Sequence, residues 1–247
     1  MQNRVALVTG GIGGIGTAIC IELAKGGAKV AANYYPSDSE LAKEWQAKMK
    51  ADGFDVMVVP GDVTNIESCQ AMIAQVEQEL GSVDILINNA GITRDGTFKK
   101  MSAEQWNAVI DTNLNSVYNV TAQVWNGMLD RGYGRIVNIS SVNGQKGQFG
   151  QANYSAAKAG IYGITKALAQ EGAAKGVTVN SISPGYIGTE MVMAIPENVR
   201  EKIVAQIPVG RLGQPSEIGR AVVFLAGEEA GFITGSNLAI NGGQHMF

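Results

Sequence analysis

Short apolar runs alternate along the chain with longer stretches in which apolar and polar positions mix. The runs are nearly continuous, which is typical of parallel strands covered on both faces. Many of the 32 glycines lie at the ends of these runs, as turns require. The pattern predicts seven strands, within residues 4–10, 28–35, 55–63, 83–91, 134–142, 177–185 and 237–243.

The stretches between the runs have the spacing of helices, for example residues 14–27 and 65–80. Asp62, Thr64 and Asn65 supply cap residues before the second of these. Alternation through the whole chain predicts one Rossmann-like, doubly wound α/β domain over residues 1–247, with about seven parallel strands and helices on both faces. Residues 188–214 break the rhythm, and we expect them to form a substrate lid.

The composition argues against several classes of protein. Apolar residues make up 45% of the 247 residues and the formal net charge is −3, so the basic surplus of nucleic-acid-binding proteins is missing. No apolar run approaches the roughly 18 residues of a membrane span, and the first strand begins at once, without a signal peptide. We therefore expect a cytoplasmic protein that binds neither nucleic acid nor membrane.

The sequence has two cysteines and one histidine, which are few residues for a metal site or for thiol chemistry. Cys20 and Cys69 fall in helix-like stretches, and we expect buried thiols in a reducing cytoplasm. His245 lies two residues from the end, so we expect no metal site and no histidine-based triad.

A glycine-rich turn leads from the first strand into the first helix. Glycines let backbone amides approach a pyrophosphate, and the following helix N-terminus favours its negative charge. The turn therefore predicts a dinucleotide site. Two patterns overlap in it: Gly11-x-Gly13-x-x-Gly16, the ordinary Rossmann spacing, and Thr9-Gly10-x-x-x-Gly14-x-Gly16, a wider one.

The end of the second strand indicates which dinucleotide binds. An acid there normally holds the ribose 2′-hydroxyl of NAD, but the position is Tyr34, and Asp38 comes too late in the loop. Without a carboxylate to repel a 2′-phosphate, NADP(H) is favoured. The usual basic partners of that phosphate are also absent, because Gly13 and Tyr35 occupy their positions.

Two Tyr-x-x-x-Lys pairs follow one another in the second half of the chain. Tyr154 and Lys158 form the first, and Tyr162 and Lys166 form the second, eight residues further on. The spacing places each tyrosine and its lysine on one helix face. At most one pair is expected to be chemical, and the spacing alone does not say which.

Three motifs together resemble the short-chain dehydrogenase/reductase family over essentially the whole chain: the turn of residues 9–16, Asn-Asn-Ala-Gly at residues 88–91, and the first Tyr-x-x-x-Lys pair. The resemblance implies that residues 61–63 and 88–92 line the adenine side of the cofactor and that residues 183–189 close over the nicotinamide. The cofactor contacts expected on this basis are Gly10, Gly13, Gly14, Ile15, Gly16, Tyr34, Gly61, Asp62, Val63, Asn89, Ala90, Gly91, Ile92, Tyr154, Lys158, Pro184, Gly185, Ile187 and Thr189.

The resemblance also separates the two pairs. In the family a catalytic serine precedes the tyrosine by thirteen residues, which leads from Tyr154 to Ser141 but from Tyr162 to Phe149. Tyr154 and Lys158 are therefore expected to be reactive, whereas the second pair is expected to be a packing tyrosine and a surface lysine. Asn113 matches a fourth family position.

Carbonyl reduction explains these residue types. A carbonyl that receives a hydride needs a proton and an oxyanion partner, which Tyr154 and Ser141 would supply. A cation about 4 Å away is worth roughly 4 kcal/mol at an effective dielectric of about 20, so we expect Lys158 to lower the tyrosine pKa from about 10 to near 7. The resemblance further implies that Lys158 binds the nicotinamide ribose and that Asn113 holds a water.

Residues 141–160 and the C-terminal stretch are similar to acetoacetyl-CoA reductases of polyhydroxybutyrate synthesis, and next to 3-oxoacyl-ACP reductases of fatty acid synthesis. The expected reaction is NADPH-dependent reduction of acetoacetyl-CoA to (R)-3-hydroxybutyryl-CoA. ACP reductases tend to carry arginines where this chain has Gly132 and Gln170, although Arg131 is adjacent, so free CoA is favoured. The candidate substrate contacts are Asp95, Gln148, Phe149, Gln151 and Tyr186, and Lys99, Lys100 and Lys146 are candidate phosphate partners.

An alternative of another class is a redox sensor that keeps the nucleotide site and binds a protein. It predicts losses among the four catalytic positions, and the sequence has none. The family resemblance implies a homotetramer. Wide apolar faces in residues 103–129 and 154–175 support one, because a single sheet is not expected to bury them.

Overall fold

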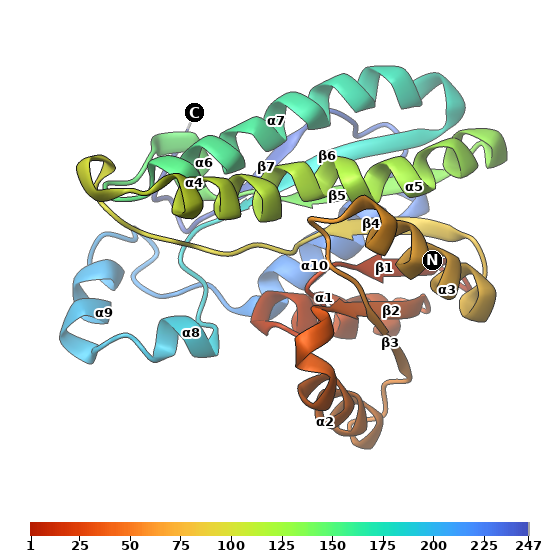
Figure 1. The fold of residues 1–247 in the computed structure, drawn as a ribbon, viewed down its shortest axis with the longest axis horizontal. Helices are drawn as coiled ribbons and strands as arrows, with labels where there is room; N and C mark the ends of the chain where they lie inside the picture. The colour runs from red at the N-terminus through yellow and green to blue at the C-terminus, as the bar shows by residue number, and fades with distance from the viewer. Residues whose placement is uncertain (247) are drawn as a thin grey trace.

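A computed structural model describes residues 1–246 of the chain. Seven parallel strands form one sheet in the order β3-β2-β1-β4-β5-β6-β7, with helices on both faces (Figure 1). This confirms the expected fold class. The strands are β1 Val5–Val8, β2 Lys29–Tyr34, β3 Val56–Pro60, β4 Val83–Asn88, β5 Gly134–Ile139, β6 Val177–Pro184 and β7 Asn237–Ile240.

The strand order reverses direction beside β1. The chain moves outward from β1 to β3 and then returns to add β4 on the other side of β1. In open α/β sheets, ligands bind beyond the carboxyl ends of the strands at such a switch point. The loops after β1 and β4 are thus where a dinucleotide is expected, and they carry the glycine-rich turn and the Asn-Asn-Ala-Gly motif.

Two apolar cores hold the helices on the sheet. Successive strand residues point to opposite faces, so Ala6 and Val8 of β1 join one core and Val5 and Leu7 join the other. The first core receives α1, α2 and α10, and the second receives α3, α5 and α7. The helices are α1 Gly14–Lys25, α2 Ser39–Ala51, α3 Ile66–Leu80, α4 Ala103–Ile110, α5 Ser116–Arg131, α6 Val142–Lys146, α7 Ala152–Gly172, α8 Glu190–Met193, α9 Glu197–Val204 and α10 Pro215–Ala226.

Local signals in the sequence account for the start of α3 and the state of the thiols. The Asn65 side chain accepts a hydrogen bond from the Ser68 backbone N–H at 2.7 Å, as expected of an N-cap. Cys20 and Cys69 are buried and free, and burial raises the pKa of Cys69 to about 11. Such thiols behave as small apolar side chains.

Residues 188–214, for which a lid was expected, form the short helices α8 and α9 and the loop after them. In Figure 1 both helices, drawn in light blue, stand away from the sheet at one end of it. Met191 and Met193 of α8 are exposed, while Ile187 pairs with Gly213 in an isolated parallel bridge that closes the base of the segment. Across residues 1–246, no helix has the length and apolarity needed to cross a bilayer.

Candidate active site

The glycine-rich turn after β1 has the shape of a phosphate cradle. Gly10 has a positive φ of 60°, and a Cβ on Gly11 would lie 2.7 Å from the Ala32 Cβ. A Cβ on Gly16 would collide with the Gly10 carbonyl oxygen. Only glycine fits at these three places, so the turn packs tightly against the start of α1, where the first backbone amides of a helix can bind an anion.

The steric requirements differ among the glycines of the two patterns, and Gly11 of the ordinary pattern is constrained as well. A Cβ on Gly14, the first residue of α1, would meet the Thr189 Cγ2 at 2.9 Å. Gly13 precedes the helix, and a Cβ on it would meet only the Gly10 carbonyl, at 3.4 Å. Gly10, Gly14 and Gly16 are therefore constrained, whereas Gly13 is not.

Buried polar side chains hold this cradle from behind. The Asn33 Oδ1 accepts from the Gly10 N–H at 3.2 Å, and its Nδ2 donates to the Gly61 carbonyl at 3.0 Å. The Thr9 hydroxyl accepts from the backbone N–H groups of Asn89 and Ala90 at 2.9 and 3.0 Å. Sequence reasoning missed Asn33, although a buried asparagine inside an apolar strand is itself a signal.

The residues expected around the adenine lie at the ends of β2, β3 and β4. Tyr34 ends β2, and no acid stands there. The Asp62 carboxylate accepts from the Thr64 backbone N–H and hydroxyl at 2.9 and 2.7 Å, so it shapes the turn after β3. The Asn89 Nδ2 donates to the Thr9 carbonyl at 2.9 Å, which joins the loops after β4 and β1.

Asn113 lies in a π-helical turn, Asp111–Asn115, between α4 and α5, and such turns are frequent at functional sites. Its Oδ1 accepts from the Ile92 N–H at 2.8 Å, and its Nδ2 donates to the Ile92 carbonyl at 2.9 Å. The carboxamide therefore fixes the Gly91–Ile92 loop. Holding a water is a separate task that these two bonds do not perform.

Tyr154, Lys158 and Ser141 come together beyond β5. The Lys158 side chain is 3% exposed, its Nζ lies 5.7 Å from the centre of the Tyr154 ring, and it donates to the Ile139 carbonyl at 2.8 Å. Ser141 caps α6, and its Oγ accepts from the Asn143 N–H at 3.1 Å. The Ser141 side chain also interacts with the Tyr154 hydroxyl.

The pKa expected for Tyr154 is wrong for this structure. Burial raises the pKa of Tyr154 above its ordinary value; interaction with Ser141 opposes the rise, and Asp95 and Tyr162 add to it. The Lys158 Nζ donates to the Ile139 carbonyl, and burial lowers the pKa of Lys158 to about 8. A hydroxyl whose pKa is raised is suited to donating a proton.

The second Tyr-x-x-x-Lys pair is only partly as expected. Lys166 is exposed. Tyr162 is more than a packing residue, however, because its hydroxyl lies 3.0 Å from the Ser141 carbonyl and 2.9 Å from the Ser183 Oγ. Sequence reasoning had no signal for these contacts, which join segments far apart in the chain.

Three polar side chains line up on the substrate side of Tyr154. The Gln151 Nε2 donates to the Asp95 carboxylate, and the Asn143 Nδ2 donates to the Gln151 Oε1, both at 2.9 Å. Asp95 and Gln151, singled out from the sequence, are thus neighbours, and Asn143 was missed. Phe149 is 86% exposed, and its expected contact with the substrate stays a prediction. Gln148 accepts from Lys146 on the exposed surface.

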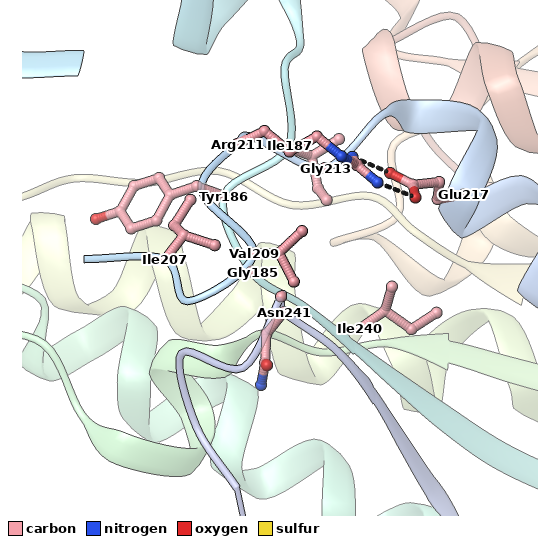
Figure 2. A pocket seen from close by; sticks show the side chains of 11 residues that line it. Gly185, Tyr186, Ile187, Ile207, Val209, Arg211, Gly213, Glu217, Ile240 and Asn241 are labelled. Carbon is pink, nitrogen blue, oxygen red and sulfur yellow. Dashed lines mark hydrogen bonds and ion pairs between the residues drawn. The ribbon is translucent and has the colours of Figure 1, made fainter. Parts of the chain in front are cut away.

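The segment after β6 reaches back over the glycine turn. Thr189 contacts Gly14, and Pro184 ends β6. A cavity of about 130 Å³ is lined in part by Gly185, Tyr186 and Ile187 of this segment. Figure 2 shows the side chains around it. At its edge Arg211 and Glu217 form two hydrogen bonds of 2.8 Å. This ion pair and the Gln214 backbone N–H lower the pKa of Glu217 to about 2.

Comparison with known proteins agrees with this geometry. Residues 10–245 match a family model described as enoyl-(acyl carrier protein) reductase. The chain is 63% identical to an acetoacetyl-CoA reductase of Shinella zoogloeoides, with 98% of this chain and 99% of that protein covered. It is 62% identical to an acetoacetyl-CoA reductase of Rhizobium meliloti, covering 99% of this chain and 100% of that protein. It is 46% identical to the 3-oxoacyl-[acyl-carrier-protein] reductase FabG of Vibrio cholerae, covering 100% of this chain and 99% of that protein.

Proposed function

The chain belongs to the short-chain dehydrogenase/reductase family, and from that premise we propose that it reduces acetoacetyl-CoA to (R)-3-hydroxybutyryl-CoA with NADPH. The observation that carries the proposal is the convergence of the half-buried Tyr154, Ser141 and the buried Lys158 beside a glycine cradle. Relatives named acetoacetyl-CoA reductase are 62–63% identical over almost the full chain, whereas the carrier-protein reductase is 46% identical. The stereochemistry follows the family resemblance alone.

NADP(H) fits the cradle, because glycine at positions 11 and 16 lets the turn pack against Ala32 and the Gly10 carbonyl at the N-terminus of α1, which favours a phosphate. Bound there, the dinucleotide supplies the hydride. Tyr34 at the end of β2 presents no carboxylate to a 2′-phosphate. The residues that we propose hold the cofactor are Gly10, Gly13, Gly14, Ile15, Gly16, Tyr34, Gly61, Asp62, Val63, Asn89, Ala90, Gly91, Ile92, Tyr154, Lys158, Pro184, Gly185, Ile187 and Thr189.

In the proposed mechanism Ser141 donates a hydrogen bond to the ketone oxygen, and Tyr154 gives that oxygen its proton. Burial keeps the Tyr154 pKa high, which suits a donor in the reductive direction. The Lys158 ammonium is buried and is worth more there than in water, because the local dielectric is low. It stabilises the tyrosinate left behind and binds the nicotinamide ribose.

Asn113 has two proposed tasks. Its carboxamide fixes the Gly91–Ile92 loop against which the cofactor packs. The water that would return a proton to Lys158 stays a prediction for this residue. The position of Gly91 supports the proposal that Asn113 lies beside the lysine. A Cβ on Gly91 would lie 3.5 Å from the Lys158 Nζ and 3.3 Å from the Asn113 Oδ1.

The proposed acyl site lies between the loop of residues 143–151 and the segment after β6. Asp95 and Gln151 form its polar wall, and their bond positions Gln151 beside Tyr154. Gln148, Phe149 and Tyr186 stay proposed contacts, with exposed Phe149 free to move over the substrate. Residues 188–214 are the proposed lid, anchored at the Ile187–Gly213 bridge.

The choice of CoA over carrier protein rests on charge. Acidic carrier proteins dock on basic surfaces, but Gly132 and Gln170 are neutral. The Arg131 guanidinium donates to the Val83 carbonyl at 2.7 Å, so one of its N–H groups already has a partner. We expect kcat/KM for acetoacetyl-CoA to exceed that for acetoacetyl-ACP. A tenfold or greater preference for the carrier-protein form, lost steeply in salt, would establish the fatty-acid-synthesis function instead.

A homotetramer is the proposed assembly. The described surface has exposed large apolar side chains on α10, on the edge strand β7 and on the connection between them: Phe224, Leu238 and Phe232. An exposed apolar patch beside an unpaired strand edge is typical of an interface. A monomeric mass by light scattering at micromolar concentration would contradict this assembly. The two free cysteines support a reducing, cytoplasmic location.

A further inference from the structure

Tyr162 belongs to a chain of hydrogen bonds that ends on the catalytic serine. Its hydroxyl lies 3.0 Å from the Ser141 carbonyl and 2.9 Å from the Ser183 Oγ. The Ser183 Oγ lies 2.7 Å from the Asn237 Oδ1, which the Ser181 Oγ also reaches at 3.0 Å. These contacts connect α7 with the carboxyl end of β5, with β6 and with the first residue of β7.

The number of hydroxyl protons determines which group donates at each step of this chain of hydrogen bonds. Tyr162 and Ser183 carry one hydroxyl proton each. Suppose that Ser181 and Ser183 both donate to the Asn237 Oδ1. Tyr162 can then donate to the Ser141 carbonyl or to the Ser183 Oγ, but not to both. The Asn237 Nδ2 is left buried without a hydrogen-bond partner. Turning the Asn237 carboxamide over gives every donor an acceptor: Asn237 donates to Ser183, Ser183 to Tyr162, and Tyr162 to the Ser141 carbonyl.

The Tyr162 side chain lies beside a cavity and is held at its hydroxyl by hydrogen bonds. A cavity of about 230 Å³ opens beside the ring, lined in part by Gln145, Thr165 and Asn237. Both polar side-chain atoms of Gln145 are buried there without a hydrogen-bond partner. A tyrosine that only filled space would not be left next to an open volume.

The Ser141 carbonyl is where this chain acts on the site. It accepts from Tyr162 and from the Gly144 N–H, which lies 3.0 Å away. Two donors on one carbonyl fix the plane of the peptide between Ser141 and Val142. That plane sets the direction of the Ser141 side chain at the start of α6, and hence where its hydroxyl meets the ketone oxygen.

We propose that Tyr162 is a positioning residue for carbonyl reduction, which acts through the backbone of Ser141 and touches neither substrate nor cofactor. The proposal rests on the proposed function for the role of Ser141. A displaced oxyanion donor costs rate, since stabilisation of the developing charge depends on geometry. Loss of one supporting hydrogen bond is expected to lower kcat about three- to tenfold.

A double-mutant cycle tests this role. We expect Tyr162→Phe to lower kcat about three- to tenfold with unchanged NADPH affinity by fluorescence titration and unchanged thermal midpoint. Ser141→Ala keeps the backbone carbonyl but removes the hydroxyl, so in that background Tyr162→Phe should change the single-turnover rate less than about twofold. Equal effects in both backgrounds, or no effect in either, would overturn the proposal.

Two controls make each outcome decisive. Ser183→Ala removes the link to Asn237 and leaves Tyr162 in place; it should give a smaller loss with the same dependence on Ser141, and it replaces Tyr162→Phe if that variant does not fold. Tyr118→Phe changes an exposed tyrosine on α5 and should leave kcat unaltered. The cycle is run with acetoacetyl-CoA and with ethyl acetoacetate. Turnover of the ester alone would refute the CoA substrate and leave the cycle valid, and turnover of neither would refute both proposals.

Discussion

The two Tyr-x-x-x-Lys pairs of α7 share one spacing and one helix but have different surroundings. Lys158 is buried, and its Nζ donates to the Ile139 carbonyl, whereas Lys166 is exposed. Tyr154 interacts with the Ser141 side chain and Tyr162 with the Ser141 backbone. One serine therefore lies between the two tyrosines and separates their tasks.

Helix geometry explains the difference. Eight residues at about 100° each amount to two turns plus roughly 80°, and to about 12 Å along the axis. The second pair therefore cannot face the cleft that receives the first. The motif fixes only that a tyrosine and a lysine are neighbours. Their chemistry depends on which neighbouring strand end each side chain reaches.

The largest expected difference between the two pairs appears when each tyrosine hydroxyl is removed in turn. Tyr154→Phe should lower kcat by roughly three orders of magnitude or more, because the ketone oxygen loses its proton donor. Tyr162→Phe should stay within about tenfold, since it loses only a positioning bond. Both are measured as NADPH oxidation with acetoacetyl-CoA, alongside NADPH affinity. Losses of similar size would show that the two tyrosines cannot be separated in this way.

The pH dependence should sharpen the contrast between the lysines. Burial lowers the pKa of Lys158 to about 8, so its charge is lost as pH rises through that value. Reduction should slow about tenfold per pH unit above it, while Tyr154, whose pKa is raised, keeps its proton. Lys166→Met should show the same profile as the unchanged protein. A Lys166 variant with an altered profile would contradict the assignment.

Stability should change in the opposite direction over the same pH range. The unfolded chain has Lys158 near its ordinary pKa of about 10.4, so between about 8 and that value it binds more protons than the folded protein. The free energy of unfolding therefore gains from this group as pH rises there. If the reduction rate falls while the contribution of Lys158 to the free energy of unfolding rises, the fall in rate is due to loss of the lysine charge and not to unfolding.

Periodicity was enough to predict the fold. Apolar runs located all seven strands, because parallel strands buried on both faces have few polar positions. A site residue with fixed local spacing, such as Gly16, was also predictable, because the atoms that constrain it, in Gly10 and Gly11, belong to the same turn.

Contacts between distant segments were not predictable from spacing. The Asn33–Gly10 and Tyr162–Ser141 hydrogen bonds each depend on how strand ends meet. The prediction of a lowered Tyr154 pKa failed for a related reason. Spacing gave its distance to a cation, but burial, which the sequence did not reveal, outweighed that cation.

The smallest expected effect concerns the cofactor, which only the first pair is proposed to reach. Tyr34→Asp should shift the ratio of kcat/KM values from NADPH toward NADH by about tenfold, because a carboxylate repels a 2′-phosphate and accepts a 2′-hydroxyl. Tyr34 stands one strand away from β1, so the fall in rate above pH 8 should be unchanged. Tyr118→Asp on α5 controls for added charge and should leave the cofactor ratio alone. An unchanged protein that already favours NADH would refute the cofactor proposal, and a pH profile moved by Tyr34→Asp would mean that Lys158 does not set it alone.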